Sequence, residues 1–414
     1  MKIAYFCEPQ VGGTFAFFQR LRPALVQHGI DMRCVSVMPK TRLTGTRYEH
    51  EEAVECVGCD VDVFNLEAMD VPTLAKCTQE IIDYLIDNQF RVIMTLAGSH
   101  VLTGNLPIYL PRSLASVIRV PMMTRGAYVP TRAVEQHVNR IIAVSDRILD
   151  DLTQRYGVDK KRVETIYHGI DLTPFTNAIP NRIDRPVEMM YAGRLWDLDK
   201  GVFLLPPIMQ QVLKSHPDVR LKIAGEGSDK EELIRRFNEV GAMPSVTMLG
   251  SLSYADLCAQ YIKSDIFILP SRFEGCGFAV LEAMAAGCAP VVADIRGSLR
   301  VLVDNGQAGC LAIVGDAKSF ATHIEALLDN PDELLRVRVA ARERVQQHYA
   351  LDRMAQQYAT LLRDVVQEPD ARTSPRNLSE YEIPRAFKPT WRTRIPAPIK
   401  NSIRKWLERF GISS

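Results

Sequence analysis

Two acidic residues, Glu274 and Glu282, bracket a turn at 275–277 that contains two glycines and leads into a stretch of small residues. An apolar run precedes the turn, so it should lie between the carboxyl end of a strand and the amino end of a helix. Parallel α/β sheets bind ligands there, and the free N–H groups favour phosphate. A carboxylate at that place fits only a ligand that also carries hydroxyls, because ionised carboxylates only accept hydrogen bonds. We therefore expect two hydroxyl sets flanking a diphosphate; alternatively, Glu274 is a solvated loop residue and Glu282 an exposed helix residue.

Two cations form a second candidate constellation. The predicted strand 187–192 leads into the loop GRLWDLDKG at 193–201, which carries Arg194 and Lys200. An arginine fork and a lysine point charge at the carboxyl end of a strand suit an anion with several oxygens. The alternative is that both are surface cations, partnered by Asp197 and Asp199.

The elements that must position these residues follow an α/β pattern. Short apolar runs alternate with amphipathic stretches, which favours parallel sheets with crossover helices. Strands are expected at 3–6, 33–38, 92–96, 122–124, 141–144, 164–167, 187–192, 220–224, 246–249, 266–269 and 290–293. Helices are expected after the Gly12-Gly13 turn, after Ser145 as N-cap, at 202–214, at 278–286, and over 331–366 with an interruption near His348.

These motifs resemble a known signature. GRLWDLDKG and EGCGFAVLEAMAAG (274–287), with AVSD (143–146), IYHGID (166–171), AGEG (224–227) and Gly12-Gly13, are similar to the family-4 retaining glycosyltransferases over most of residues 1–350. The resemblance implies the GT-B fold, two doubly wound Rossmann-like domains facing a cleft. It would comprise an acceptor-side domain at 1–180, a donor domain at 181–350 and a helix at 351–370 crossing back to the first domain. A basic, proline-rich tail follows at 371–414.

The resemblance also implies roles for individual residues. Glu282 would bind the donor ribose, Glu274 the hydroxyls of the transferred sugar, and the Cys276, Gly277 and Phe278 backbone would contact sugar and phosphate. Arg194 and Lys200 would neutralise the diphosphate leaving group, and Gly13 would close over the donor from the first domain. The catalytic set is thus Arg194, Lys200 and Glu274, with no metal and no cofactor besides the nucleotide-sugar substrate. Fixed cations and helix N–H groups can stabilise a departing diphosphate in this way.

The implied activity is a retaining hexosyltransferase with a glycan or lipid-linked acceptor, acting in polysaccharide or glycoconjugate biosynthesis. One position departs from the family pattern: in the stretch 122–127, Arg125 stands where many members carry a histidine. Arginine cannot act as a general base at neutral pH, so Arg125 would instead contact a donor phosphate or an anionic acceptor. His100 in the AGSH stretch is a second candidate for such a contact.

The composition of the chain limits which binding partners and which cellular compartment we expect. With 50 basic and 49 acidic side chains, the net charge of +1 gives no reason to expect nucleic acid. Nine cysteines and an immediate strand-like start predict a reduced, cytoplasmic protein without a signal peptide. The segment 371–414 holds ten Lys or Arg and three Glu, and residues 399–410 predict an amphipathic helix with a basic face. That helix would contact the inner membrane face peripherally, or dock on the protein or a second subunit.

Other functions compete with this interpretation. The Cys56–Cys59 spacing is that of a zinc half-site, but no second pair or histidine cluster completes it in the sequence. The first turn is not GxGxxG, which argues against NAD or FAD. A two-domain non-enzymatic binding protein remains an alternative, as does a catalytically weakened glycosyltransferase-like partner subunit, for which Arg125 is the motive.

Overall fold

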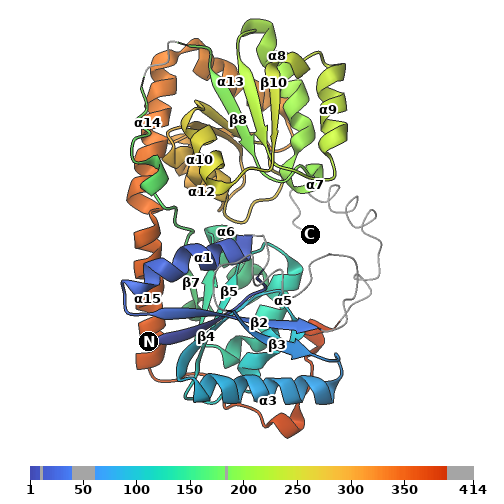
Figure 1. Cartoon of the computed structure of the whole chain (residues 1–414), viewed down its shortest axis with the longest axis vertical. Helices are drawn as coiled ribbons and strands as arrows, with labels where there is room; N and C mark the ends of the chain where they lie inside the picture. The colour runs from blue at the N-terminus through green and yellow to red at the C-terminus, as the bar shows by residue number, and fades with distance from the viewer. Residues whose placement is uncertain (10–12, 40–60, 182–184, 389–414) are drawn as a thin grey trace. The chain divides into compact units, whose positions relative to one another are not determined.

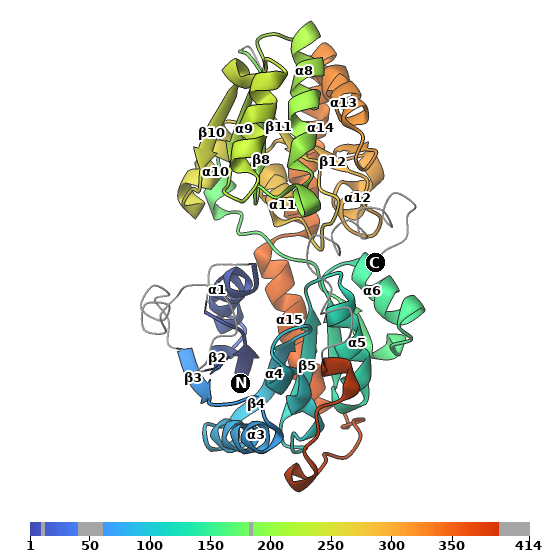
Figure 2. The same cartoon turned by 90° about the vertical axis from the view of Figure 1, so that its right-hand side faces the viewer.

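The computed structural model describes residues 1–9, 13–39, 61–181 and 185–388. Cα proximity divides the chain into two compact units, Met1–Tyr167 with Met354–Ser414, and His168–Arg353. Each unit is a parallel sheet with helices on both faces (Figures 1 and 2). The expected class, two doubly wound α/β domains, is therefore confirmed. The Cys56–Cys59 pair and the predicted amphipathic helix at 399–410 lie outside the described residues.

The first unit contains a seven-stranded sheet in the order β3-β2-β1-β4-β5-β6-β7. The central strand β1 is almost entirely apolar because helices cover both faces of the sheet; the side chains of Ile3, Ala4 and Tyr5 have no exposed area. The strands are β1 (Lys2–Phe6), β2 (Asp31–Pro39), β3 (Val61–Leu66), β4 (Phe90–Leu96), β5 (Ala115–Val120), β6 (Arg140–Ala143) and β7 (Val163–Thr165). The main helices are α1 (Gly13–Val26), α3 (Val71–Asp87), α4 (Val101–Asn105), α5 (Arg125–Val134), α6 (Asp146–Asp150) and α15 (Leu351–Gln367).

The strand expected at 122–124 was a wrong prediction. The strand there is β5, which ends at Val120, and Thr124 instead caps α5 by accepting a hydrogen bond from the Ala127 N–H. β5 is difficult to predict from sequence because the charged residue Arg119 interrupts its apolar run. Arg119 is nevertheless buried, with 1% of its surface exposed. The Arg119 guanidinium lies 3.8 Å from the centre of the Phe17 ring on α1, a cation–π contact that helps a buried cation. The short strands β3 and, in the second unit, β13 (Cys310–Ala312) were also not predicted.

The second unit contains a six-stranded sheet in the order β10-β9-β8-β11-β12-β13. On its faces α8 packs against α13, and α11 packs against α14 (Figure 2). The strands are β8 (Glu188–Ala192), β9 (Arg220–Ala224), β10 (Val246–Gly250), β11 (Ile266–Leu269), β12 (Ala289–Ala293) and β13 (Cys310–Ala312). The helices are α7 (Asp197–Lys200), α8 (Leu205–Ser215), α9 (Lys230–Glu239), α10 (Tyr254–Ile262), α11 (Phe278–Ala285), α12 (Leu299–Leu302), α13 (Ala317–Asp329) and α14 (Pro331–His348).

Helix boundaries follow local chemistry. The helix expected at 202–214 begins as a 3₁₀ turn, Val202–Leu204, and becomes α8 at Leu205, where Pro206 occupies a first-turn position that needs no N–H partner. The long region at 331–366 is interrupted as expected, between α14 and α15. Among the described helices, none combines the length and apolar character needed to cross a bilayer.

Each sheet has one place where the strand order reverses. In the first unit this is between β1 and β4, and in the second between β8 and β11. Loops leaving the carboxyl ends of such a strand pair run in opposite directions and leave a crevice between them, where ligands bind. In the second unit these loops are 193–201 and 270–277, the two segments that carry the candidate site residues.

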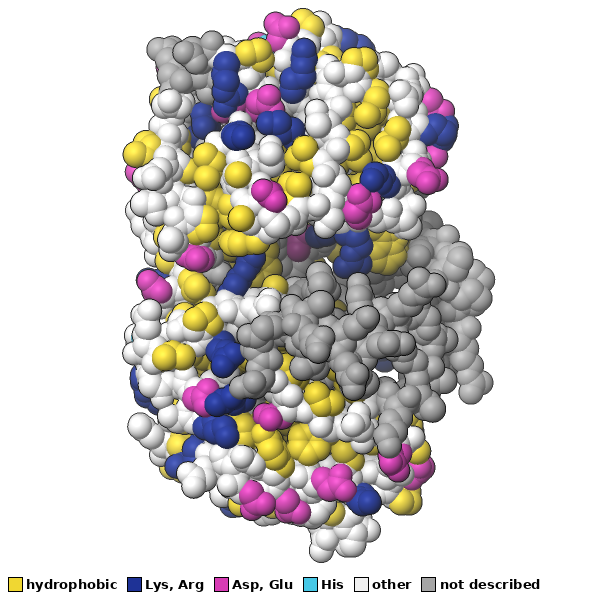
Figure 3. Space-filling model, in the orientation of Figure 1, with side chains coloured by type: hydrophobic (Ala, Val, Ile, Leu, Met, Phe, Trp, Pro, Cys, Tyr) yellow, Lys and Arg dark blue, Asp and Glu magenta, His cyan; other side chains and the backbone are white. Residues whose placement is uncertain are grey.

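A C-terminal segment, residues 370–388, lies on the first unit. The Arg376 N–H donates to the Ile108 carbonyl at 3.0 Å, and the rings of Tyr109 and Tyr381 stack with centroids 4.8 Å apart. The Phe387 ring packs so close to Gly104 of α4 that a Cβ there would lie 2.4 Å from it. On the face shown in Figure 3, basic and acidic side chains are interspersed with apolar ones, in keeping with the near-neutral net charge.

Candidate active site

The loops after β8 and β11 are held together by backbone contacts. The Asp199 carbonyl accepts hydrogen bonds from the N–H groups of Arg272 and Phe273, at 2.8 and 3.3 Å. Gly201 ends α7 in the left-handed region (φ 62°), and a Cβ there would lie 2.2 Å from the Pro270 carbonyl oxygen. Only glycine permits this approach, which fixes the distance between the lysine-bearing loop and the Glu274 loop.

Lys200 and Glu274 meet across these two loops. The Lys200 Nζ lies 2.6 Å from Glu274 Oε2, and the two side chains are 24% and 14% exposed. The other carboxylate oxygen, Oε1, accepts the Gly277 N–H at 3.2 Å. Gly277 precedes α11 in the left-handed conformation (φ 74°), so its N–H belongs to the anion-favouring helix start. Glu274 is therefore a half-buried, paired carboxylate, and the alternative of a solvated loop residue is wrong.

Glu282 lies inside the unit. Its side chain is on the first turns of α11 and the residue is 4% exposed, so the alternative of an exposed helix residue is also wrong. The Tyr261 hydroxyl of α10 is 3.5 Å from Glu282 Oε2. Burial, reinforced by the Glu282 carboxylate, raises the pKa of Tyr261 well above its ordinary value, so this hydroxyl remains a neutral donor.

Arg194 is an exposed residue beside the same loops. Its guanidinium lies 5.6 Å from the Trp196 ring centre, and its carbonyl accepts from the Tyr191 hydroxyl at 2.9 Å. The loop is joined to the AGEG segment, because the Leu195 N–H donates to the Glu226 carbonyl at 2.9 Å. A Cβ at Gly225 would lie 1.9 Å from the Gly193 carbonyl oxygen, so the AGEG glycine permits this packing. These backbone contacts therefore fix the position of the Arg194 main chain, from which the exposed side chain extends.

Asp197 contacts residues of the neighbouring loops. It lies 3.6 Å from Arg272 and accepts the Phe203 N–H at 3.1 Å, so it braces the loop. Since Lys200 is paired with Glu274, the expected alternative of a Lys200 surface cation partnered by aspartates does not describe its contact here.

Three candidates lie in the first unit. Gly13 is the first residue of α1, and Arg125 is an exposed residue at the first position of α5. His100 caps α4, where its Nδ1 accepts the Leu102 N–H at 3.2 Å, and burial lowers its pKa. A Cβ at Gly98 would lie 3.5 Å from the Ala127 backbone, so the His100 and Arg125 loops are in contact.

Sequence reasoning missed the aromatic residues behind the site. Burial first, then the Glu274 charge, raise the pKa of Tyr191 well above its ordinary value. The ring of His168 stacks on Phe278 at the start of α11, with centroids 4.0 Å apart. His168 lies in the IYHGID stretch, but Tyr191, Tyr261 and His168 are far in sequence from Glu274, Glu282 and Phe278, so no local pattern indicated these contacts.

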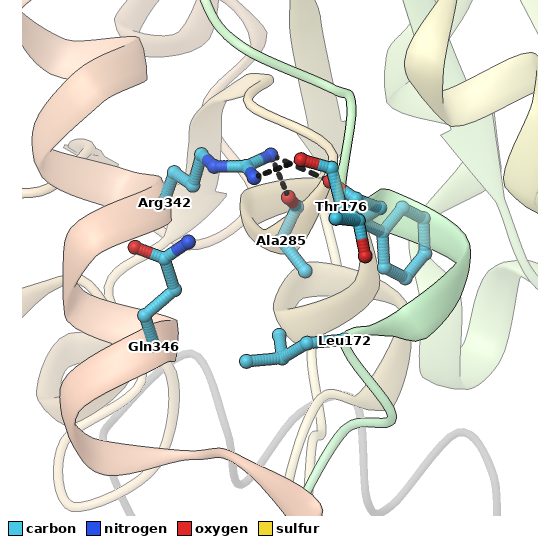
Figure 4. A pocket seen from close by; sticks show the side chains of 6 residues that line it. Leu172, Thr176, Ala285, Arg342 and Gln346 are labelled. Carbon is cyan, nitrogen blue, oxygen red and sulfur yellow. Dashed lines mark hydrogen bonds between the residues drawn. The ribbon is translucent and has the colours of Figure 1, made fainter.

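A separate cavity of about 170 Å³ lies at the other end of α11 (Figure 4). It is lined by Leu172, Phe175, Thr176, Ala285, Arg342 and Gln346. The Arg342 guanidinium there donates to the carbonyls of Phe175 (2.8 Å), Thr176 (3.1 Å) and Ala285 (3.1 Å), and also to that of Ala178. This cation is committed to joining a loop to α11 and does not belong to the candidate site.

Two doubly wound units, with paired cations and carboxylates where the strand order reverses, are typical of the GT-B class of glycosyltransferase folds. The glycosyl transferases group 1 model matches residues 176–344, and the glycosyltransferase family 4 model matches residues 118–174. The chain therefore belongs to the glycosyltransferases that these two models describe, group 1 and family 4, as the sequence resemblance implied.

Known proteins agree with this assignment. The chain is 31% identical over 205 residues to glycogen synthase from Mycobacterium tuberculosis, covering 50% of this chain and 49% of that protein. It is 33% identical over 190 residues to a GDP-mannose:cellobiosyl-diphosphopolyprenol alpha-mannosyltransferase from Xanthomonas campestris, covering 45% and 48%. The chain thus spans about half the length of these curated relatives. Anabaena HepE, solved with UDP-glucose, shares the fold with a TM-score of 0.69 at 18% identity, over 88% of this chain and 100% of that one.

Proposed function

We propose that the chain is a retaining glycosyltransferase that moves a hexose-type sugar from a nucleoside-diphosphate sugar to a glycan or lipid-linked acceptor. Its role would be in polysaccharide or glycoconjugate biosynthesis. The observation that carries this proposal is the convergence of Lys200, Glu274 and the Gly277 N–H at the carboxyl ends of the paired strands β8 and β11. A cation, a hydroxyl acceptor and a helix-start donor within hydrogen-bond reach suit a sugar diphosphate.

The donor is held by named groups in this proposal. Glu282 accepts hydrogen bonds from the ribose hydroxyls, Glu274 accepts them from the transferred sugar, and Arg194 with Lys200 binds the diphosphate. The backbone of Cys276, Gly277 and Phe278 contacts sugar and phosphate, and Gly13 closes over the donor. The relative named for GDP-mannose, and the fold relative solved with UDP-glucose, support this donor class.

The proposed chemistry is transfer with retention. The acceptor oxygen bonds to the anomeric carbon on the face from which the diphosphate departs, and the bond from that carbon to the phosphate oxygen breaks. The acceptor proton passes to the leaving diphosphate. Arg194, Lys200 and the α11 N–H groups stabilise the negative charge that develops, and in this scheme they make a metal unnecessary.

Arg125 is proposed to contact a donor phosphate or an anionic acceptor, with His100 on the neighbouring loop. A cation at the first position of a helix lies at the wrong end of the helix dipole, and a bound anion would relieve this. A cytoplasmic location with membrane contact through residues 399–410 is part of the same proposal; its support is the basic, amphipathic sequence there.

The test is binding and turnover with UDP-, GDP- and ADP-linked sugars. Thermal shift ranks the ligands, because binding to the folded state raises stability, and release of nucleoside diphosphate measures turnover. We expect Glu282→Ala and Arg194→Ala each to weaken donor binding by about tenfold, since each removes a charged hydrogen-bond partner. Arg235→Ala, on the exposed face of α9, is the matched control.

Two outcomes would count against the proposal. Donor binding that is unchanged in Glu282→Ala and Arg194→Ala would remove the site assignment. A pure wild-type chain that binds donors but never turns them over, with any acceptor or water, would favour the partner-subunit alternative.

A further inference from the structure

Glu274 occupies the proposed anion site from within the chain. Its carboxylate holds the Lys200 ammonium at 2.6 Å through one oxygen and the Gly277 N–H at 3.2 Å through the other. These are two of the donors that the proposed function assigns to the diphosphate of the ligand. The Glu274 carboxylate and the diphosphate of a ligand would therefore compete for the same two donors.

The pair is held by the backbone. The loops that carry Lys200 and Glu274 are fixed by the contact of Gly201 with Pro270 and by the hydrogen bonds to the Asp199 carbonyl. Both side chains are half-buried, so their attraction is less screened than that of an exposed ion pair. A diphosphate that binds Lys200 must break this attraction and must also tolerate the Glu274 charge nearby.

We propose that Glu274 discriminates between the intact nucleotide-sugar and the nucleoside-diphosphate product, an inference that rests on the proposed function of this site. The intact donor carries sugar hydroxyls, which can replace Lys200 and Gly277 as hydrogen-bond partners of the displaced carboxylate. The product carries none, so its diphosphate competes with Glu274 without compensation. Once the sugar has left, the carboxylate returns to Lys200 and promotes product release.

The test is a charge-neutral, same-size substitution, Glu274→Gln. Affinities for a nucleoside diphosphate and for its glucose or mannose conjugate are measured by calorimetry, using the pair of UDP, GDP or ADP compounds that binds wild type best. We expect the variant to bind the diphosphate about tenfold more tightly, because the competing charge is gone. It should bind the sugar conjugate more weakly, because an amide accepts the sugar hydroxyls less well than a carboxylate does.

Glu188→Gln is the matched control. Glu188 pairs with Lys222 at 2.9 Å, with side chains 27% and 20% exposed, at the amino end of β8 and so away from the site. Loss of this ion pair should leave both affinities unchanged. A double-mutant cycle with Lys200→Gln adds a second measurement: the tightening caused by Glu274→Gln should largely disappear when Lys200 is absent.

The outcomes separate this inference from the proposed function. Wild type that binds neither the diphosphates nor the sugar conjugates overturns the proposed function. Wild type that binds both, with Glu274→Gln binding the diphosphate no more tightly, overturns the discrimination by Glu274. Equal tightening with and without Lys200 also overturns it, because the effect would then not come from the ion pair.

Discussion

At the scale of single residues, both candidate carboxylates have a buried tyrosine beside them. Tyr261 faces Glu282, and the Glu274 charge acts on Tyr191. Burial and the carboxylates hold the pKa of each tyrosine far above the physiological range, so both hydroxyls stay neutral. The Tyr191 hydroxyl donates to the Arg194 carbonyl, whereas the Tyr261 hydroxyl faces Glu282 and, as a neutral donor, can orient that carboxylate without cancelling its charge. That arrangement suits a carboxylate that must accept hydrogen bonds from ligand hydroxyls.

The Tyr261 hydroxyl should therefore position Glu282. In Tyr261→Phe we expect the KM for the donor to rise several-fold with little change in kcat, because the hydroxyl supports binding rather than bond breaking. The free energy of unfolding should fall by about 1 kcal/mol, the usual net loss for one hydrogen bond. Steady-state kinetics and denaturant unfolding measure the two effects.

Tyr84→Phe is the matched control for this substitution. The Tyr84 hydroxyl of α3 is hydrogen-bonded to the Asp62 carboxylate in the first unit, and burial is the main cause of its raised pKa. Its loss should lower stability without changing the donor KM. If both variants left the KM unchanged, Tyr261 would be a structural residue only.

At the scale of elements, a comparison of two left-handed glycines distinguishes the two reasons for which a glycine is needed: a positive φ angle and close contact with a neighbouring backbone. Gly201 (φ +62°) has the Pro270 carbonyl oxygen 2.2 Å from where its Cβ would be. Gly241 (φ +69°), at the end of α9, has nothing within 4 Å of that place. The two glycines share a backbone conformation and differ in the packing around it.

We expect Gly241→Ala to cost about 1 kcal/mol, the penalty for a left-handed alanine. Gly201→Ala should cost at least about 2 kcal/mol more, because the loops after β8 and β11 must also move apart. Since that movement separates Lys200 from Glu274, Gly201→Ala should also weaken donor binding, whereas Gly241→Ala should not. Chemical denaturation and calorimetry with the best-binding nucleotide-sugar test this; equal losses in the two variants would contradict it.

The arrangement of helices and strands also explains which parts of the fold and of the candidate site could be predicted from the sequence. Loop motifs predicted the candidate residues, because a turn between a strand and a helix has local chemistry that glycine, acid and base types reveal. The strand order, which brings the Lys200 loop to the Glu274 loop, depends on pairing between β8 and β11 and leaves no local trace. Burial also depends on residues far away in the sequence. From sequence alone Glu282 could be an exposed helix residue, because the covering helix α10 is not local to it. The charge of Arg119 likewise made the buried strand β5 difficult to predict.

At the scale of the whole molecule, the chain returns to the first unit after Arg353 and ends its described part there. Arginines of the first unit hold the returning segment by its backbone: Arg112 donates to the Asp370 carbonyl at 3.1 Å, and Arg162 to the Ala371 carbonyl at 3.1 Å. The Thr373 N–H in turn donates to the Gln136 carbonyl at 2.8 Å. This segment thereby brings two cations, Arg372 and Arg376, near His137.

Stability of the first unit should therefore depend on pH. Burial first, then Arg376 and Arg372, lower the pKa of His137 below its ordinary value of 6.5. The unfolded chain binds a proton at His137 more readily than the folded one. The contribution of His137 to stability is therefore fully present above pH 6.5 and is lost as the pH falls below that value towards the folded pKa. Hydrogen exchange of peptides from β4 to β6 should show weaker protection at pH 5.5 than at pH 7.5, after correction for intrinsic exchange rates. Arg376→Gln should reduce this difference in protection between the two pH values, and His137→Gln should reduce it further. Arg235→Gln in the second unit is the control and should leave the difference unchanged. An unchanged pH dependence in His137→Gln would contradict the mechanism.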